Sequence, residues 1–281
     1  MLDWWYILID FILPFQWTEH LFMKNALLAV LLVTPLFGIL GTMVVSNRMA
    51  FFSDSLGHGA FTGIALGAMV GGVKPVWAAT LFSVVFAITI TIIKNKSKTS
   101  TDTIIGVFSS TAVALGLVIM SYGGSFNKFS SYLIGDLLSI TAAEIVLLFI
   151  VFIAIILLWI LIFNKVLMVS INQSLAASKG INTLFSEALF TCAIAVVVTI
   201  TIQWVGLLII NSLLVLPAAA ARNITINVRQ YHFAAVAISI VSGVTGLMLS
   251  YYLNTSSGAT IVLVSAFFFF LTFALRRNFQ G

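Results

Sequence analysis

Unbroken apolar segments constrain the fold of this 281-residue chain more than any other feature of its sequence. Nine segments hold 17 to 22 residues each, close to the ~20 residues that a membrane-spanning helix needs. Polar and apolar residues do not alternate within them, which excludes a transmembrane β-barrel. The sequence therefore predicts an all-α polytopic membrane protein with spans at 25–45, 51–71, 75–93, 103–122, 142–163, 184–204, 205–221, 232–253 and 259–275.

Composition leaves little room for a soluble part. The chain is 61% hydrophobic and 7% charged, whereas a soluble domain is roughly 25% charged. The longest stretch between two predicted spans is about 20 residues, too short for a soluble catalytic domain. Because no loop signal separates 184–204 from 205–221, eight spans are the alternative. The single cysteine, Cys192, excludes an intrachain disulfide and a cysteine-rich zinc site.

Lysine and arginine are distributed unevenly over the loops on the two sides of the membrane. One set of loops carries ten of the 13, at Arg48, Lys94, Lys96, Lys98, Lys165, Lys179, Arg222, Arg229, Arg276 and Arg277. The other set carries three, at Lys24, Lys74 and Lys128. The positive-inside rule makes the first set cytoplasmic, so we expect the N-terminus outside and the C-terminus in the cytoplasm. This sidedness accounts for the net charge of +5 without a nucleic-acid partner.

Three regions follow from this topology. Residues 1–24 are apolar and aromatic and predict an N-terminal interfacial segment, interrupted at Pro14, rather than a cleaved signal peptide. Residues 25–275 form the transmembrane domain, and residues 276–281 form a cytoplasmic tail. On the outer side, 129–141 is too short to span and predicts a re-entrant or surface helix. On the inner side, 94–102 predicts a plain polar loop.

The second span contains an aspartate and a histidine, Asp54 and His58, four residues apart. On a helix they share one face, about 6 Å apart along the axis. Ionisable side chains inside a membrane are costly and usually mark a substrate path, and both of these bind divalent metals. The alternative is that the two side chains only satisfy each other, or pair with Arg48.

Four glycines at a spacing of four, Gly59, Gly63, Gly67 and Gly71, follow in the same span. This small-residue stripe lets another helix approach closely. Asp54 and His58 lie about 140° and about 100° away from it. We therefore hypothesise that Asp54, His58 and Thr62 face a translocation path while the glycines pack.

The span at 205–221 offers two further polar residues, Asn211 and Ser212. They are candidates for the same path, and helix packing is the alternative for both. Two copies of the chain on a two-fold axis would supply two aspartates and two histidines, which matches the four ligands that zinc prefers. Separate pathways within each subunit are the competing geometry.

Residues 170–180, SINQSLAASKG, predict a short cytoplasmic helix. Asn172 can cap its start, Ala176 favours helix, and Gly180 fits its end. A small exposed helix between two spans suggests a docking surface, and an ordinary connecting helix is the alternative.

These motifs resemble the membrane subunits of metal-cation ABC importers, the zinc and manganese uptake family. The resemblance extends over nearly the whole chain after Asn25. It lies in VSNRMAFFSDSLGHGAFTG from Val45, SYLIGDLLSIT at 131–141, VGLLIINSLLVLPAAAAR at 205–222 and SGATIVL at 257–263, which follow one another in the family's order.

The resemblance implies a fold like that of the vitamin B12-type ABC importers. Asp54 and His58 match the positions that contact the metal, and 170–180 matches the coupling helix, with Asn172, Leu175, Ala176 and Gly180 as its docking residues. The chain departs from the family at Gly57, where Ser or Ala is usual. The aspartate that starts the family's coupling segment is also absent, with Asn172 nearby.

The resemblance also implies cargo and partners. TDTIIGV at 101–107 and Asp136 are closer to the zinc branch, so Zn²⁺ is favoured and Mn²⁺ is the alternative. The chain has no GxxxxGK[ST] motif, so ATP hydrolysis would need a separate partner and this chain is expected to be no enzyme. The expected assembly is two copies of this permease with two cytoplasmic ABC ATPase subunits and an extracellular metal-binding protein, in the bilayer of a bacterial cytoplasmic membrane. A stand-alone ion-coupled metal carrier is the alternative from another class.

Overall fold

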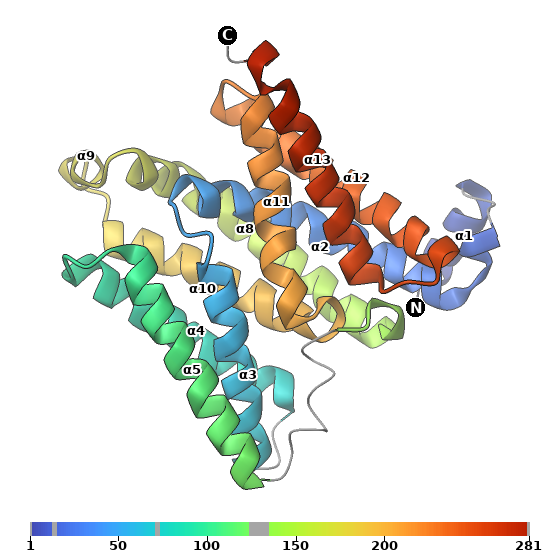
Figure 1. Ribbon diagram of the computed structural model, residues 1–281, viewed down its shortest axis with the longest axis horizontal. Coiled ribbons are helices and arrows are strands. Elements are labelled where there is room, and N and C mark those ends of the chain that lie inside the picture. Colours follow the sequence, from blue (N-terminus) through green and yellow to red (C-terminus); the bar gives the residue numbers. More distant parts are fainter. Residues whose placement is uncertain (1, 13–15, 71–73, 124–134, 280–281) are drawn as a thin grey trace. The chain divides into compact units, whose positions relative to one another are not determined.

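The computed structural model describes residues 2–12, 16–70, 74–123 and 135–279 (Figure 1). Helices and their connecting turns make up these residues, and none of them forms a strand. Every predicted span coincides with a helix. These helices are α2 (Leu21–Ser46), α3 (Phe52–Val70), α4 (Pro75–Lys96), α5 (Thr101–Gly123), α8 (Ala142–Ile171), α10 (Thr183–Val205), α11 (Leu207–Ile224), α12 (Val228–Leu253) and α13 (Ser257–Phe279).

Seven of these helices are long and apolar enough to cross a membrane, namely α2, α4, α5, α8, α10, α12 and α13. The other two are α3, which carries Asp54 and His58, and α11, which is only 18 residues long. The all-α polytopic fold is thus confirmed, while the count of nine spans and the sidedness of the termini stay predictions.

Several helices extend beyond the predicted bounds, and the largest difference is at the end of α8. Helix α2 begins at Leu21 rather than at residue 25, and α8 continues to Ile171 rather than ending at residue 163. No glycine or proline follows residue 163 before the end of α8, and Asn164 and Lys165 are tolerated inside a helix. The chain therefore stays helical well beyond the apolar segment that predicted the span.

The N-terminal segment forms α1 (Asp3–Ile12) and the short 3₁₀ helix η1 (Gln16–Glu19). Polar contacts fasten α1 to the start of α2. The Trp5 indole N–H donates to the Lys24 carbonyl at 2.9 Å, and the Lys24 ammonium lies 2.5 Å from an Asp10 carboxylate oxygen. The predicted break at Pro14 lies outside the described residues.

Of the predicted outer helix at 129–141, only the residues from 135 onward are described. They form the three-residue 3₁₀ helix η2 (Leu137–Ser139), and the Asp136 side chain accepts the Leu138 N–H at 3.1 Å.

The chain divides into two compact units. Unit 1 comprises Met1–Thr42, Gly135–Ala154 and Ser212–Gly281, and unit 2 comprises Met43–Ile134 and Ile155–Asn211. Helices α2, α8 and α11 each pass from one unit into the other.

Unit 1 is held together by close contacts of α12 with α2 and α13. The Ser239 hydroxyl donates to the Thr34 carbonyl at 2.7 Å. A Cβ built at Gly246 would lie 2.5 Å from the Cα of Ile261 on α13. The absence of a side chain at Gly246 therefore lets the two helices touch.

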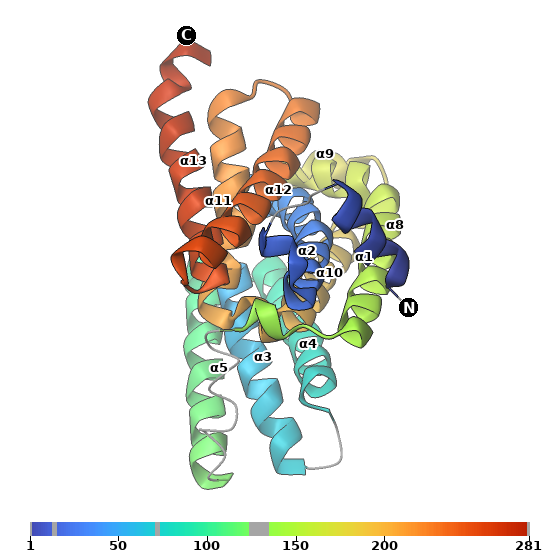
Figure 2. The ribbon, with the colours of Figure 1, turned by 90° about the vertical axis from the view of Figure 1, so that its right-hand side faces the viewer.

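In unit 2, α3 packs against α4, α5 and α10 (Figures 1 and 2). The predicted glycine stripe forms the seam with α4. A Cβ at Gly63 would lie 2.7 Å from the Ala79 Cα, and one at Gly67 would lie 2.6 Å from the Ala78 Cβ. Close packing along the stripe is confirmed for these two residues and for Gly59, while Gly71 lies outside the described residues.

Candidate functional site

The site begins with a tight turn between α2 and α3. Arg48 takes a left-handed backbone with φ of 56°, and the Phe52 N–H returns to the Met49 carbonyl at 2.9 Å. Asp54 falls in the first turn of α3, where the positive end of the helix dipole favours a carboxylate. The local sequence thus places an acid at the start of the helix and His58 one turn further along.

The two side chains face each other at a defined distance. The Oδ2 of Asp54 lies 3.5 Å from the Nε2 of His58. This exceeds the 2.7–3.2 Å that is typical of a hydrogen bond to nitrogen, so the pair satisfies itself only in part. Arg48 is exposed and forms no ion pair within the described residues, so pairing of Asp54 with Arg48 is not the arrangement found.

Asp54 and His58 are more exposed than the other residues in the first part of α3. Between Phe52 and Ala65, Asp54 and His58 are the two side chains that are not buried. Their exposed fractions are 39% for Asp54 and 27% for His58. The remainder of this stretch is enclosed by packing, so polar ligand atoms are presented where the surface of α3 is open.

The separation of the two atoms suits one metal ion. Two ligand atoms that are each about 2.1 Å from a tetrahedral zinc lie about 3.4 Å apart. The part of the chain that the structure describes contains no group of three or more His, Cys, Asp or Glu side chains able to hold a metal. Asp54 and His58 therefore provide two side chains of this kind at this place, and no third one joins them among the described residues.

Thr62, which the sequence grouped with the pair, has a different environment. It is 1% exposed, and its hydroxyl donates to the Ala112 carbonyl of α5 at 2.5 Å. A Cβ at Gly116 of α5 would lie 3.0 Å from that hydroxyl oxygen. In this conformation Thr62 joins α3 to α5.

Asn211 is brought close to the start of α3. Its side-chain oxygen accepts a hydrogen bond from the hydroxyl of Ser53, the residue before Asp54. One turn further along α3, a Cβ at Gly57 would lie 3.2 Å from the Leu207 Cγ. The departure from the family at Gly57 therefore gives Leu207 room to approach. Ser212 is half-buried and belongs to unit 1.

The predicted cytoplasmic helix is present as α9 (Gln173–Ser178). Its N-cap is confirmed, because the Asn172 side-chain oxygen accepts the Leu175 N–H at 3.0 Å. Gly180 follows the C-cap Lys179 with φ of 78°, a backbone that suits glycine. From Ile171 to Gly180 only Ala176 is buried, while Leu175 is 48% exposed. Nearly all of the surface of α9 is therefore exposed in this chain.

Sequence reasoning missed a charged cluster at the ends of α4 and α10. The Lys94 ammonium forms an ion pair with the Glu187 carboxylate. The Asn95 amide donates to the second Glu187 oxygen at 2.8 Å, and the Gln173 amide donates to the Asn95 carbonyl oxygen at 2.7 Å. Glu187 lies inside the predicted span 184–204, and a carboxylate in a span is the signal that also singled out Asp54.

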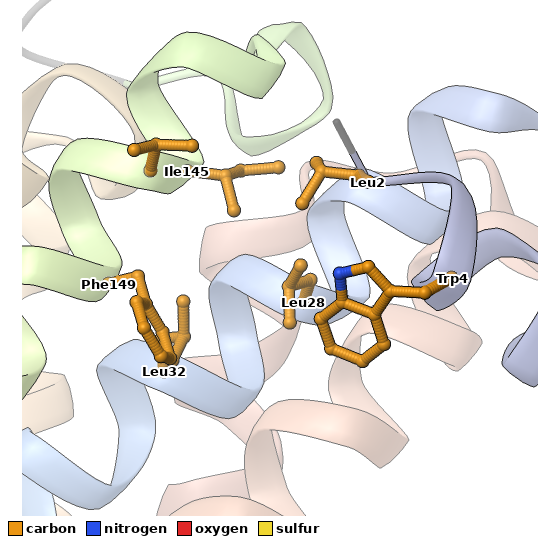
Figure 3. A pocket seen from close by; sticks show the side chains of 7 residues that line it. Leu2, Trp4, Leu28, Leu32, Ile145 and Phe149 are labelled. Atoms are coloured by element: carbon orange, nitrogen blue, oxygen red, sulfur yellow. The ribbon is translucent and has the colours of Figure 1, made fainter.

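A cavity of about 230 Å³ lies in unit 1 between α1, α2 and α8 (Figure 3). Its lining is apolar, and the side chains of Trp4, Leu28, Leu32, Ile145 and Phe149 surround it. None of its lining residues is a carboxylate, imidazole or thiolate, so the cavity has no chemistry for a divalent metal.

Comparison with known proteins covers nearly the whole chain. The profile of the ABC 3 transport family matches residues 19–276. The chain is 30% identical over 247 residues to the high-affinity zinc uptake system membrane protein ZnuB of Buchnera aphidicola, covering 87% of this chain and 94% of that protein. It is 28% identical over 255 residues to the manganese transport system membrane protein MntC of Listeria monocytogenes, covering 91% of each.

A solved structure has the same fold. PsaBC from Streptococcus pneumoniae in complex with Fab matches with a TM-score of 0.78 and 27% sequence identity. The match covers 97% of this chain and 95% of the matched chain. The similarity therefore includes both units of the chain.

Proposed function

Because the chain belongs to the ABC 3 transport family, whose matched members include zinc and manganese transport proteins, we propose that it conducts Zn²⁺ across a bacterial cytoplasmic membrane as the permease of an ATP-driven importer. The chain is a multi-pass membrane protein and a transport subunit of a metal importer.

The geometry of Asp54 and His58 carries the proposal. Their ligand atoms are 3.5 Å apart, which fits two ligands of one ion, and both side chains are accessible in a stretch of α3, residues 52–65, that is otherwise buried. A carboxylate and an imidazole exposed to lipid would be costly. An ion in transit supplies the positive charge that compensates for the carboxylate.

A second permease copy would complete the coordination shell. Asp54 and His58 of two copies provide four ligands, and a two-fold axis brings the same surface patch of each copy together. Asn211 is fixed to Ser53 beside Asp54 and lies next to this path, with Ser212 following it. Thr62 supports the path from the seam with α5.

Movement of the ATPase subunits acts on this chain through α9. The helix is short, capped at Asn172 and exposed at Leu175, which suits a surface that docks into an ATPase, while the buried Ala176 anchors it. ATP binding and hydrolysis by two ABC ATPase subunits would displace α9 and alternate the access of the Asp54–His58 pair. An extracellular metal-binding protein would deliver the ion.

Manganese is the second candidate cargo, because MntC of Listeria monocytogenes is similar over the same length. An imidazole and a carboxylate suit both metals. Uptake of each metal alone, and of Zn²⁺ with Mn²⁺ in excess, separates the two candidates.

The proposal is tested by ATP-driven Zn²⁺ uptake into liposomes that contain the importer with its ATPase and binding protein. We expect Asp54→Ala and His58→Ala each to lower uptake at least tenfold, with the complex still assembled. Asp102→Ala, which removes an exposed carboxylate at the start of α5, is the matched control and should leave uptake unchanged. Normal uptake by both site variants would refute the role of the pair, and uptake without the ATPase would favour a stand-alone carrier.

A further inference from the structure

Four polar side chains from α4, α9 and α10 form a connected set of contacts. Glu187 at the start of α10 uses both carboxylate oxygens, one in the ion pair with Lys94 and the other accepting from the Asn95 amide. Asn95 in turn accepts from the Gln173 amide of α9 at 2.7 Å. We name these four residues, Lys94, Asn95, Gln173 and Glu187, the polar clamp.

Two members of the clamp, Lys94 and Glu187, are largely buried. The Glu187 side chain is 9% exposed and that of Lys94 is 21% exposed. Charged groups that are taken out of water keep their partners, because an unpaired charge there is strongly unfavourable. With both of its oxygens engaged, the carboxylate of Glu187 has little freedom to turn, and it fixes Asn95 in the orientation that receives Gln173.

Helix α9 has few other attachments. It is six residues long, and Ala176 is its one buried side chain. A helix of this length is not stable by itself, so its contacts determine where it lies. The hydrogen bond from Gln173 is therefore one of the contacts that hold α9 near the end of α4.

The end of α4 is in turn connected to the helix that carries the metal ligands. Gly63 and Gly67 let the backbone of α3 lie directly on α4, and α10 contacts both helices. The Lys94 ammonium also lies 3.7 Å from the Met49 sulfur, in the turn that precedes α3. The clamp, α9, Asp54 and His58 all belong to unit 2.

We propose that the polar clamp transmits displacement of α9 to α4 and α10, and through their packing to α3 with Asp54 and His58. Gln173, Asn95, Lys94 and Glu187 are positioning residues that touch neither metal nor nucleotide. The inference rests on the proposed function, since it assumes that α9 docks into the ATPase. Tightly packed helices move as units rather than deforming continuously, so a break in the clamp separates ATP hydrolysis from metal movement.

The test measures Zn²⁺ transported per ATP hydrolysed by the complete importer in liposomes. Gln173→Ala removes the hydrogen bond to Asn95 at an exposed position and leaves the Lys94–Glu187 pair intact. We expect the ratio to fall about twofold to tenfold, with ATPase binding and ATP hydrolysis retained. Gln230→Ala, which truncates an exposed glutamine in the first turn of α12, is the matched control and should keep the ratio of the unaltered importer.

A double-mutant cycle shows whether Gln173 and Asn95 act through their mutual bond. Asn95→Ala combined with Gln173→Ala should lower the ratio no further than Asn95→Ala alone. An unchanged ratio in Gln173→Ala, or losses that add in the double variant, would overturn the clamp while the unaltered importer still transports Zn²⁺. Failure of the unaltered importer to transport Zn²⁺ or Mn²⁺ would instead overturn the proposed function.

Discussion

Gly63 of α3 lies directly against Ala79 of α4, such that a Cβ at Gly63 would be 2.7 Å from the Ala79 Cα. The neighbouring atom is backbone, so it cannot move aside as the end of a flexible side chain would. The position of α3, and with it that of Asp54 and His58, therefore depends on the missing side chain at residue 63.

Gly63→Val should force α3 away from α4. We expect the free energy of unfolding of the purified chain to fall by ~1–3 kcal/mol. We also expect the variant to lose Zn²⁺ uptake, measured in liposomes. Gly106→Ala is the control, because a Cβ there meets no atom within 4 Å. Unaltered stability and uptake in Gly63→Val would contradict the packing described for α3 and α4.

The sequence predicted the helices and the stripe well, for a physical reason. Apolar segments of spanning length have few alternatives in a bilayer, because the backbone must satisfy its own hydrogen bonds. The glycine spacing predicted a close helix contact but not its partner, since spacing on one helix carries no information on which neighbour fills the seam. The N-cap at Asn172 was predictable because it depends on residues within one turn.

The polar contacts between distant segments were not predictable. Ser53 and Asn211 are 158 positions apart, and Thr62 bonds a backbone carbonyl, an acceptor that every residue carries. Glu187 was noticeable as a carboxylate in a predicted span, but its partner Lys94 was read as part of a solvated loop. The end of α8 was predicted too early, because the apolar segment ends at residue 163 while the chain remains helical to Ile171.

The Lys94–Glu187 ion pair gives a prediction on stability. Glu187→Leu leaves the Lys94 ammonium without its partner in a largely buried position, which should destabilise the purified chain by ~3 kcal/mol. Adding Lys94→Met should recover much of that loss, because neither charge then remains. Lys98→Met, which alters an exposed lysine in the same loop, serves as the control. If Glu187→Leu alone were as stable as the unaltered chain, the ion pair between Lys94 and Glu187 would not be formed.

Thr62→Val shows whether the Thr62 hydroxyl serves helix packing or contacts the transported ion. Valine has nearly the same shape but cannot donate to the Ala112 carbonyl, so we expect a loss of ~0.5–1.5 kcal/mol in stability. Because the hydroxyl is engaged with α5, Zn²⁺ uptake should stay within about twofold of the unaltered importer. Strong loss of uptake with full stability would instead show that the hydroxyl meets the ion during transport.

Acid should weaken uptake, because an imidazole must be neutral to bind a metal and the proton competes for the same nitrogen. Zn²⁺ transported per ATP should therefore be higher at neutral pH than in acid, because fewer protons then compete with the metal for the imidazole nitrogen. In His58→Asp, which keeps an oxygen ligand, the decline of the remaining uptake should move to lower pH. A profile of the unaltered importer that stays flat to below about pH 5 would argue against a histidine ligand.

The most direct measurement is the position of the bound ion in the assembled importer. Crystals of the importer, trapped with Zn²⁺ in its transport path, would give this position from anomalous scattering at the zinc absorption edge. We expect a zinc peak about 2.1 Å from the His58 Nε2 and from an Asp54 carboxylate oxygen. Zinc peaks elsewhere in the permease, with Asp54 and His58 facing lipid and remote from any of them, would contradict this expectation.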